Sequence, residues 1–271
     1  VWIFDKEGHI QEGDPLQNAD PKWNYHNGLI DFPDQIAQGL HIRMKTPIQH
    51  IEQTATGWAL FTTADHLLGT FNQLLITIPA PQAADLIEKC RHSIYPISDP
   101  THTDLRERIS SILRTASYNP LISVALGYTP TPQTRPYYAL VNTDKAHPIS
   151  WLAWEHEKSP ERVPPNSGLL IAQMAPRYSH NFWHTSDEEI IHDVTQLVTN
   201  LIKEPLHTPI FTDIQRWQYA LPATKADATQ LNALTLPLGL AFCGDAFVSG
   251  RVHLALEHAT IVAHQLRRQH T

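Results

Sequence analysis

The segment from Leu238 to Arg268 reads LGLAFCGDAFVSGRVHLALEHATIVAHQLRR and decides the fold. Its opening apolar run predicts a short buried strand, which Gly244 and Asp245 end. Beyond Gly250 the apolar residues recur at the spacing of one helix face, and they are Val252, Ala255, Leu256, Ala259, Val262 and Leu266. The segment therefore predicts a strand, a Gly-Asp turn, a glycine-bearing loop and a helix.

The start of this helix has a chemical use. The backbone N–H groups of residues 251–254 have no partner within the helix, and they carry the positive end of its dipole. A ligand with an anionic or electron-rich edge can bind there. Asp245, at the end of the strand, can accept a hydrogen bond from a sugar hydroxyl. The simpler alternative is a strand-to-helix turn that Asp245 caps.

Two stretches carry a resemblance to a known family. The order Gly244-Asp245, Gly250-Arg251-Val252, then Ala255, resembles the "GD…GRVEGA" segment of the FAD-dependent amine oxidase superfamily, and renalase-like bacterial oxidoreductases in particular. Residues 216–222, RWQYALP, resemble the "RWRYALP" segment of the same family at the expected distance upstream. Glu257 and His258 depart from the pattern, since small residues are usual there. The similarity extends over nearly the whole chain.

The resemblance implies a cofactor and the residues that hold it. The cofactor is FAD, and the helix start would stabilise the negative charge that hydride transfer places on the flavin N1–C2=O edge. The backbone near Ile48 would meet the adenine, although its side chain also fits plain core. Neither cysteine has the context of a covalent flavin link, so noncovalent FAD is expected. The expected cofactor-binding residues are Gly244, Asp245, Gly250, Arg251, Val252 and Ile48.

The expected fold class is α/β with mixed α+β character. It comprises an incomplete Rossmann-like FAD-binding domain, residues 1–80 and 216–271, and an antiparallel-sheet substrate domain, residues 81–215. Alternating patterns predict a β-meander over 41–45, 48–53 and 58–63, followed by a strand over 71–78. Helices are predicted over 83–90 and 105–116. A capping box from Ser186 to Glu189 predicts the start of a further helix.

One expected motif is missing. A dinucleotide-binding βαβ unit needs the closely spaced glycines of G-x-G-x-x-G, but no two of the 11 glycines lie closer than five positions. The same spacing excludes the hydrolase nucleophile elbow. In the resembled family the dinucleotide motif stands at the extreme N-terminus. The expectation is an N-terminally truncated family member, and the alternative is a lineage that lost the motif.

Composition argues against several other classes of protein. The net charge of −7 argues against nucleic acid as a partner, and no apolar run approaches the about 18 residues of a membrane span. The two cysteines, Cys90 and Cys243, allow one disulfide at most, and Cys243 in the apolar run fits a buried thiol. This fits a reducing compartment, so a cytoplasmic location is expected. The 17 histidines lack the zincin spacing, and no metal is expected.

The expected activity is oxidoreduction of a small molecule. The resemblance implies hydride transfer from a reduced nicotinamide- or amine-type substrate to FAD, and then to oxygen. No catalytic residue is assigned, because the cofactor carries the hydride. Aromatic residues that could stack on a ring-shaped substrate, or simply fill the core, are Trp217, Tyr219, Trp151 and Trp154. The alternatives are an amine or carotenoid-type oxidase on the same fold and a non-catalytic scaffold or binding module. The substrate, the electron acceptor and the oligomeric state are left open.

Overall fold

The computed structural model describes residues 1–268 except 22, 24, 26–27 and 97–102. The described chain forms two compact units, each made of two separate stretches of sequence. The first unit contains residues 1–42 and 120–218, and the second contains residues 43–119 and 219–271. None of the helices in the described ranges combines the length and the apolar character that a membrane crossing requires.

The first unit is built on a seven-stranded sheet in the order β11-β7-β10-β9-β8-β1-β2. Adjacent strands run antiparallel from β7 to β8, whereas β1 pairs with β8 in parallel. Two of the strands, β7 and β11, continue into the second unit. The elements are β1 (Trp2–Phe4), β2 (Ile10–Glu12), α1 (Pro15–Ala19), α2 (Asp31–Ile36), β7 (Ser117–Tyr128), β8 (Ala139–Asn142), β9 (Ile149–Trp154), α5 (Glu155–Lys158), β10 (Gly168–Met174), α6 (Pro176–Asn181), α7 (Asp187–Ile202) and β11 (Phe211–Thr224).

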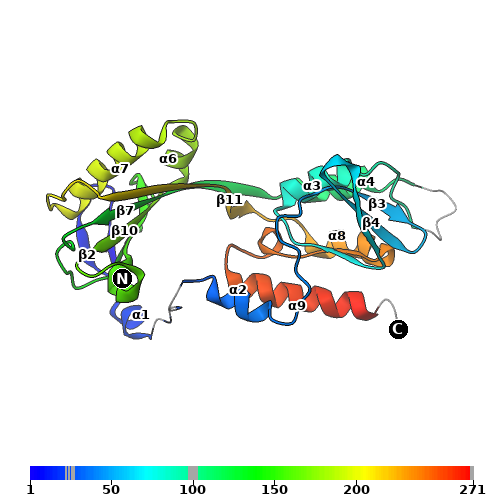
Figure 1. Cartoon of the computed structure of the whole chain (residues 1–271), viewed down its shortest axis with the longest axis horizontal. Helices are drawn as coiled ribbons and strands as arrows, with labels where there is room; N and C mark the ends of the chain where they lie inside the picture. The colour runs from blue at the N-terminus through cyan, green and yellow to red at the C-terminus, as the bar shows by residue number, and fades with distance from the viewer. Residues whose placement is uncertain (22, 24, 26–27, 97–102, 269–271) are drawn as a thin grey trace. The chain divides into compact units, whose positions relative to one another are not determined.

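Helix α7 covers this sheet because its sequence is capped and amphipathic. The Ser186 hydroxyl accepts from the Glu189 backbone N–H, and the Glu189 carboxylate accepts from the Ser186 N–H, so the predicted capping box is confirmed. The buried side of the helix, including Ile190, Val194 and Val198, packs in one core with strand residues such as those of β7 and β10. Figure 1 shows α6 and α7 together over one face of the sheet.

The second unit combines an antiparallel meander with a short parallel pair. Strands β3, β4 and β5 pair antiparallel in chain order, while β6 pairs in parallel with β12 from near the end of the chain. Helices α3, α4 and α8 share a core with these strands. The elements are β3 (Ile48–Thr54), β4 (Gly57–Thr62), β5 (Leu67–Phe71), β6 (Leu74–Ile76), α3 (Ala80–Glu88), α4 (Arg106–Leu113), α8 (Ala228–Thr235), β12 (Leu240–Phe242) and α9 (Val252–Arg268).

Two strand predictions are wrong in detail. Residues 41–45 are not a strand, and the third strand of the meander is β5 instead. The strand expected over 71–78 is two strands, because the chain leaves β4 after Phe71 and pairs next with β12 from Leu74. The Leu74 N–H donates to the Gly239 carbonyl at the start of that second pairing. Apolar character alone does not reveal such a change of partner.

The compact units also differ from the predicted domain boundaries. Residues 1–42 pack with the large sheet rather than with residues 43–80, because β1 hydrogen-bonds to β8. Residues 81–119 pack with the meander, since α3 and α4 bury their apolar faces in its core. Tertiary pairing over more than one hundred residues sets these boundaries, and no local pattern marks them.

Asp104 in the second unit predicts a pH dependence of stability. Burial opposes its ionisation, but hydrogen bonds from the Arg106 side chain, the Arg106 N–H and the Ile94 N–H lower its pKa to about 2. A carboxyl whose folded-state pKa is depressed stabilises the fold above its unfolded pKa of about 3.9 and loses that contribution as pH falls. We expect Asp104→Asn to flatten the fall in stability between about pH 4 and pH 2. Urea denaturation at several pH values tests this, and parallel curves for the two proteins would refute it.

Candidate functional site

The residues of the deciding segment gather at the carboxyl ends of the parallel pair. The Cys243 N–H donates to the Ile76 carbonyl, so β12 and β6 end side by side. Gly244 follows with a φ of 128°, where residues with a side chain are strained, and a Cβ there would lie 3.4 Å from the Thr77 carbonyl oxygen. The carboxyl ends of parallel strands are where open α/β sheets bind ligands.

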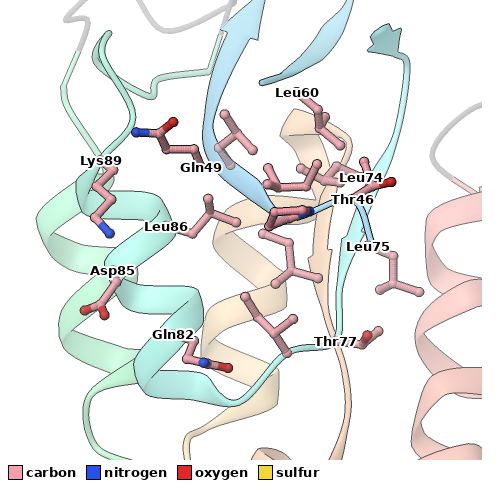
Figure 2. A pocket seen from close by; sticks show the side chains of 15 residues that line it. Thr46, Gln49, Leu60, Leu74, Leu75, Thr77, Gln82, Asp85, Leu86 and Lys89 are labelled. Atoms are coloured by element: carbon pink, nitrogen blue, oxygen red, sulfur yellow. The ribbon is translucent and has the colours of Figure 1, made fainter. Parts of the chain in front are cut away.

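A cavity of about 620 Å³ lies beside β6. Consecutive residues from Leu74 to Ile78 line it, and since neighbouring residues of a strand face opposite sides, the cavity lies along the edge of the strand. Ile48 at the start of β3 lines it too and packs on the core. Figure 2 shows the remaining wall, in which Gln82, Asp85, Leu86 and Lys89 project from α3; the labelled residues of the strand side are Leu74, Leu75 and Thr77. Ile48 and Thr77 thus line one cavity, and Gly244 lies next to Thr77.

Asp245 is held by a residue that the sequence did not indicate. The Tyr118 hydroxyl donates to Oδ1 of Asp245 at 3.1 Å. Tyr118 is half-buried, and its ring meets that of Tyr219 edge-on with centroids 5.4 Å apart. The hydrogen bond spans 127 positions of sequence, which is why no local spacing pointed to it.

Gly250 joins the two stretches that carry the family resemblance. A Cβ at Gly250 would lie 2.4 Å from a methyl carbon of Leu221 and 3.4 Å from Cδ of Pro222. Both of those residues belong to the 216–222 stretch on β11. The absence of a side chain at Gly250 thus allows the loop before α9 to pack closely against β11.

The start of α9 is accessible. Arg251 precedes the helix and is exposed, and Val252, its first residue, keeps 50% of its surface exposed. The predicted apolar face is buried only in the second half of the helix, where Val262 and Leu266 pack with Ala241 and Cys243. The first turns therefore present backbone N–H groups and apolar side chains that the described chain does not bury.

The four aromatic candidates lie in different surroundings. Trp154 is 1% exposed and packs edge-on against Tyr137 in the first unit's core, so its face is not available for stacking and the core interpretation applies. Trp151 is half-buried, and the Lys158 ammonium lies 5.9 Å from its ring centroid. Trp217 is 55% exposed, and Tyr219 contacts Tyr118 as described above. Only Tyr219 is linked to the Asp245 site within one unit.

Arg216, which heads the matched 216–222 stretch, has a structural role in the first unit. Its guanidinium donates to the backbone carbonyls of Trp183 and Thr185 and to the Asp187 carboxylate. These three contacts fasten β11 to the loop that precedes α7. The positive charge of Arg216 therefore holds β11 in place, whereas Leu221 of the same stretch contacts Gly250.

Cys243 is a buried free thiol, as predicted, and Cys90 is buried and free as well. Burial raises the pKa of Cys90 and of Cys243, and their thiols remain protonated at neutral pH. Neither is therefore a reactive nucleophile. This is consistent with the expectation of noncovalent cofactor binding.

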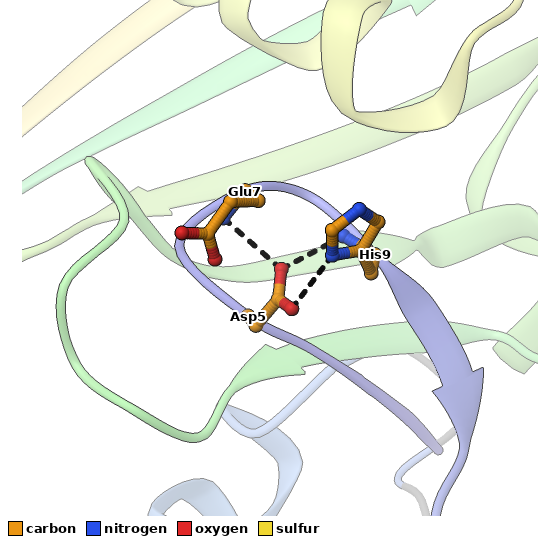
Figure 3. A group of neighbouring side chains, drawn as sticks. All are labelled: Asp5, Glu7 and His9. Carbon is orange, nitrogen blue, oxygen red and sulfur yellow. Dashed lines mark hydrogen bonds and ion pairs between the residues drawn. The ribbon is translucent and has the colours of Figure 1, made fainter.

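Asp5, Glu7 and His9 gather on an exposed loop of the first unit, with spacing that could admit a metal ion. The Asp5 carboxylate already accepts from the Glu7 N–H, the His9 N–H and the His9 ring, as Figure 3 shows. These bonds make it the cap of its own turn, and the backbone hydrogen bond from His9 lowers its pKa. The cluster is thus explained by the loop, and the absence of a metal remains a prediction.

The sequence of residues 5–267 matches the family model for flavin-containing amine oxidoreductases. This chain belongs to that family. Within the second unit, Gly244 follows the parallel pair, and Gly250 packs against Leu221 and Pro222 of the 216–222 stretch. The family is one of flavin-dependent oxidoreductases.

Solved structures share the fold of this chain at low identity. A proposed protoporphyrinogen oxidase from Exiguobacterium sp. 255-15 is 19% identical with a TM-score of 0.68, and the match covers 93% of this chain and 55% of the other. A double mutant of putrescine oxidase is 11% identical with a TM-score of 0.65, covering 90% and 53%. Wild-type putrescine oxidase bound to putrescine is 13% identical with a TM-score of 0.62, covering 87% and 53%. This chain spans a little over half the length of these structures.

Proposed function

We propose that this chain forms part of a renalase-like FAD-dependent oxidoreductase, which transfers hydride from a small reduced nicotinamide- or amine-type substrate to FAD and then to oxygen. The observation that supports this most is the position of Gly244 and Asp245 at the carboxyl ends of β12 and β6, beside the 620 Å³ cavity. The family assignment supplies the flavin. When bound, FAD supplies the hydride acceptor.

The residues present fit such a cofactor. Gly244 lets a ligand approach the backbone, because a side chain there would be strained by the positive φ and would meet Thr77. Tyr118 donates to Oδ1 of Asp245, whereas Oδ2 accepts no hydrogen bond from the described residues and is available to accept from a sugar hydroxyl. Arg251 and Val252 present the helix start to an electron-rich edge. Ile48 contributes an apolar wall beside the adenine.

We propose that FAD is bound noncovalently and that the protein is cytoplasmic. Both cysteines are buried with raised thiol pKa values, which disfavours a thioether link to the flavin. Free thiols in both positions also fit a reducing compartment. Tyr219 and Trp217, and with less support Trp151, are the candidates for contact with the substrate. The division of labour between a cofactor part, residues 1–80 and 216–271, and a substrate part, residues 81–215, remains part of this proposal.

The proposed function requires a nucleotide-binding βαβ unit, and the free edge of β6 is a place where a strand of that unit can pair. The outer edge of β12 is closed, because the Asn232 side chain bonds both the N–H and the C=O of Phe242. In the described chain β6 pairs with β12 alone, so its other edge faces the cavity. Two strands make a marginal sheet, and parallel sheets are normally larger. We propose that polypeptide outside this sequence adds a parallel strand to β6 and brings the missing glycine motif to Gly244.

A second candidate function rests on the glycine spacing. Without G-x-G-x-x-G in its 271 residues, this polypeptide alone can be a non-catalytic scaffold or binding module. An amine or carotenoid-type oxidase on the same fold is a further alternative. Adding FAD to the purified chain and then dialysing distinguishes a part of an enzyme from a non-catalytic scaffold. A flavin spectrum that is retained near neutral pH would contradict the scaffold hypothesis.

Replacing Asp245 tests the cofactor site in the whole protein that its gene encodes. We expect Asp245→Asn to weaken flavin binding roughly ten- to a hundredfold, because a hydrogen bond to a charged acceptor contributes about 1.5–3 kcal/mol. Quenching of flavin fluorescence measures the dissociation constant. Release of intact FAD by acid precipitation tests the noncovalent link.

Asp193→Asn is the matched control, since Asp193 also accepts a hydrogen bond from a tyrosine, Tyr178, but in the first unit. We expect it to leave the flavin dissociation constant unchanged. Equal flavin affinity in wild type and Asp245→Asn would remove Asp245 from the site. A wild-type protein that never holds flavin would overturn the proposed function itself.

A further inference from the structure

Tyr118 stands where three parts of the candidate site meet. It lies near the start of β7, its hydroxyl donates to Asp245 at 3.1 Å, and its ring packs edge-on against Tyr219. Asp245 follows β12, and Tyr219 lies on β11. All three residues belong to the second unit, so this arrangement is internal to one compact body.

The direction of the hydrogen bond follows from the chemistry of its two partners. A phenol has a single proton to donate, whereas an ionised carboxylate can only accept. The Tyr118 hydroxyl therefore donates its proton to Oδ1 of Asp245.

The hydroxyl keeps its proton across the working pH range. Burial raises the pKa of Tyr118 above its ordinary value near 10, and the neighbouring negative charge of Asp245 raises it further. Tyr118 is consequently a permanent donor, and Asp245 keeps one oxygen occupied. A carboxylate held at one oxygen has its plane and rotamer restricted, which directs the second oxygen away from Tyr118.

We propose that Tyr118 is a positioning residue for the cofactor site, holding Asp245 so that its second oxygen meets a ligand hydroxyl, and bracing the ring of Tyr219 beside it. The proposal rests on the proposed function, because it assigns Asp245 to that ligand. The positioning role goes beyond the proposed function, because it links Asp245 at the cofactor site to Tyr219, a candidate substrate residue, through one side chain. Tyr118 touches neither ligand nor reacting atoms in this scheme and acts through its two neighbours.

The decisive variant is Tyr118→Phe, which keeps the ring contact with Tyr219 and removes only the hydroxyl. We expect the flavin dissociation constant to rise about tenfold, as for the loss of one hydrogen bond to a charged group. The variant should also shift the absorption spectrum of the bound flavin. Tyr178→Phe is the matched control, because it removes the same kind of tyrosine–carboxylate bond, to Asp193, in the first unit. Its flavin dissociation constant and spectrum should equal those of the wild type.

A double-mutant cycle separates positioning from a general loss of structure. If Tyr118 acts through Asp245, then Tyr118→Phe should leave flavin affinity unchanged in a protein that already carries Asp245→Ala. A merely structural tyrosine would weaken binding by the same factor in both backgrounds. Wild-type affinity in Tyr118→Phe, or equal losses in both backgrounds, would overturn the proposal.

A flavin-free measurement keeps this test distinct from that of the proposed function. In the apoprotein, tyrosinate absorbance reports the ionisation of Tyr118, identified as the signal that Tyr118→Phe removes. Asp245→Asn should lower that titration midpoint, because the negative charge that opposes phenolate formation is gone. A lowered midpoint supports the pairing even if wild type binds no flavin, in which case the proposed function alone fails. An unchanged midpoint would show that the two side chains are not coupled and would overturn the positioning role.

Discussion

Trp58→Ala is expected to lower the free energy of unfolding of the second unit by about 3–5 kcal/mol, the range for removing a large buried aromatic side chain. Trp58 is fully buried on β4, in the core that the meander shares with α3, α4 and β12. Its indole N–H also donates to the Leu238 carbonyl at 2.9 Å, 180 positions away. The substitution therefore opens a cavity and leaves a buried carbonyl without its donor.

Urea denaturation followed by circular dichroism measures this effect without relying on tryptophan fluorescence. Trp58→Phe separates the effect of lost volume from that of the lost hydrogen bond. Phenylalanine fills most of the volume but offers no donor, so about 1–3 kcal/mol of the loss should remain. Trp23→Ala is the control, since Trp23 is 95% exposed, and its change should stay within about 0.5 kcal/mol. Equal stability of wild type and Trp58→Ala would contradict the burial on which the second unit's core is argued.

Asn232→Ala is expected to cost about 2–5 kcal/mol, because it deprives two buried backbone groups of their partners. The Asn232 amide donates to the Phe242 carbonyl at 3.1 Å and accepts from the Phe242 N–H at 2.9 Å. Both groups belong to the outer edge of β12, and Asn232 is itself buried on α8. Since Gly244 and Asp245 follow that strand directly, we also expect weaker flavin binding in this variant.

Gln230→Ala is the matched control for Asn232→Ala. Gln230 lies on the same helix with an exposed side chain, so its replacement deprives no strand edge of a partner. Alanine has a higher helix propensity than either residue, so propensity opposes the loss expected for Asn232→Ala. Thermal unfolding should give a clearly lower midpoint for Asn232→Ala than for Gln230→Ala. Coincident midpoints would mean that water or a shifted backbone replaces the asparagine amide at no cost.

Local sequence patterns predicted those secondary-structure elements that depend on neighbouring residues. The capping box at Ser186 and the apolar spacing after it gave α7 because a helix start and a buried helix face are written in neighbouring residues. The Gly244-Asp245 turn and the helix after Gly250 were predicted for the same reason. The family could likewise be reached from two short stretches, residues 216–222 and 244–255, and the match of the family model over residues 5–267 confirms it.

The candidate site was predictable only in part. Ile48 lines the cavity beside β6, Gly244 lies against Thr77 after that strand, and Asp245 pairs with Tyr118, while their roles toward a cofactor stay predictions. Trp154 fills a core, and Tyr118 and Asn232 were not singled out. A tyrosine that bonds an aspartate 127 residues away has no local signature, and neither does an asparagine that caps a strand edge.

The sequence by itself determined the two stretches that carry the family resemblance, the absence of a closely spaced glycine motif within these 271 residues, the buried thiol of Cys243 and the main helices. Only the tertiary structure decided which strands pair, that residues 1–42 join the large sheet, and that Tyr118 holds Asp245. Helices, caps and turns depend on residues within a few positions of one another. Strand partners and side-chain pairs depend on surfaces that exist only after distant segments have packed.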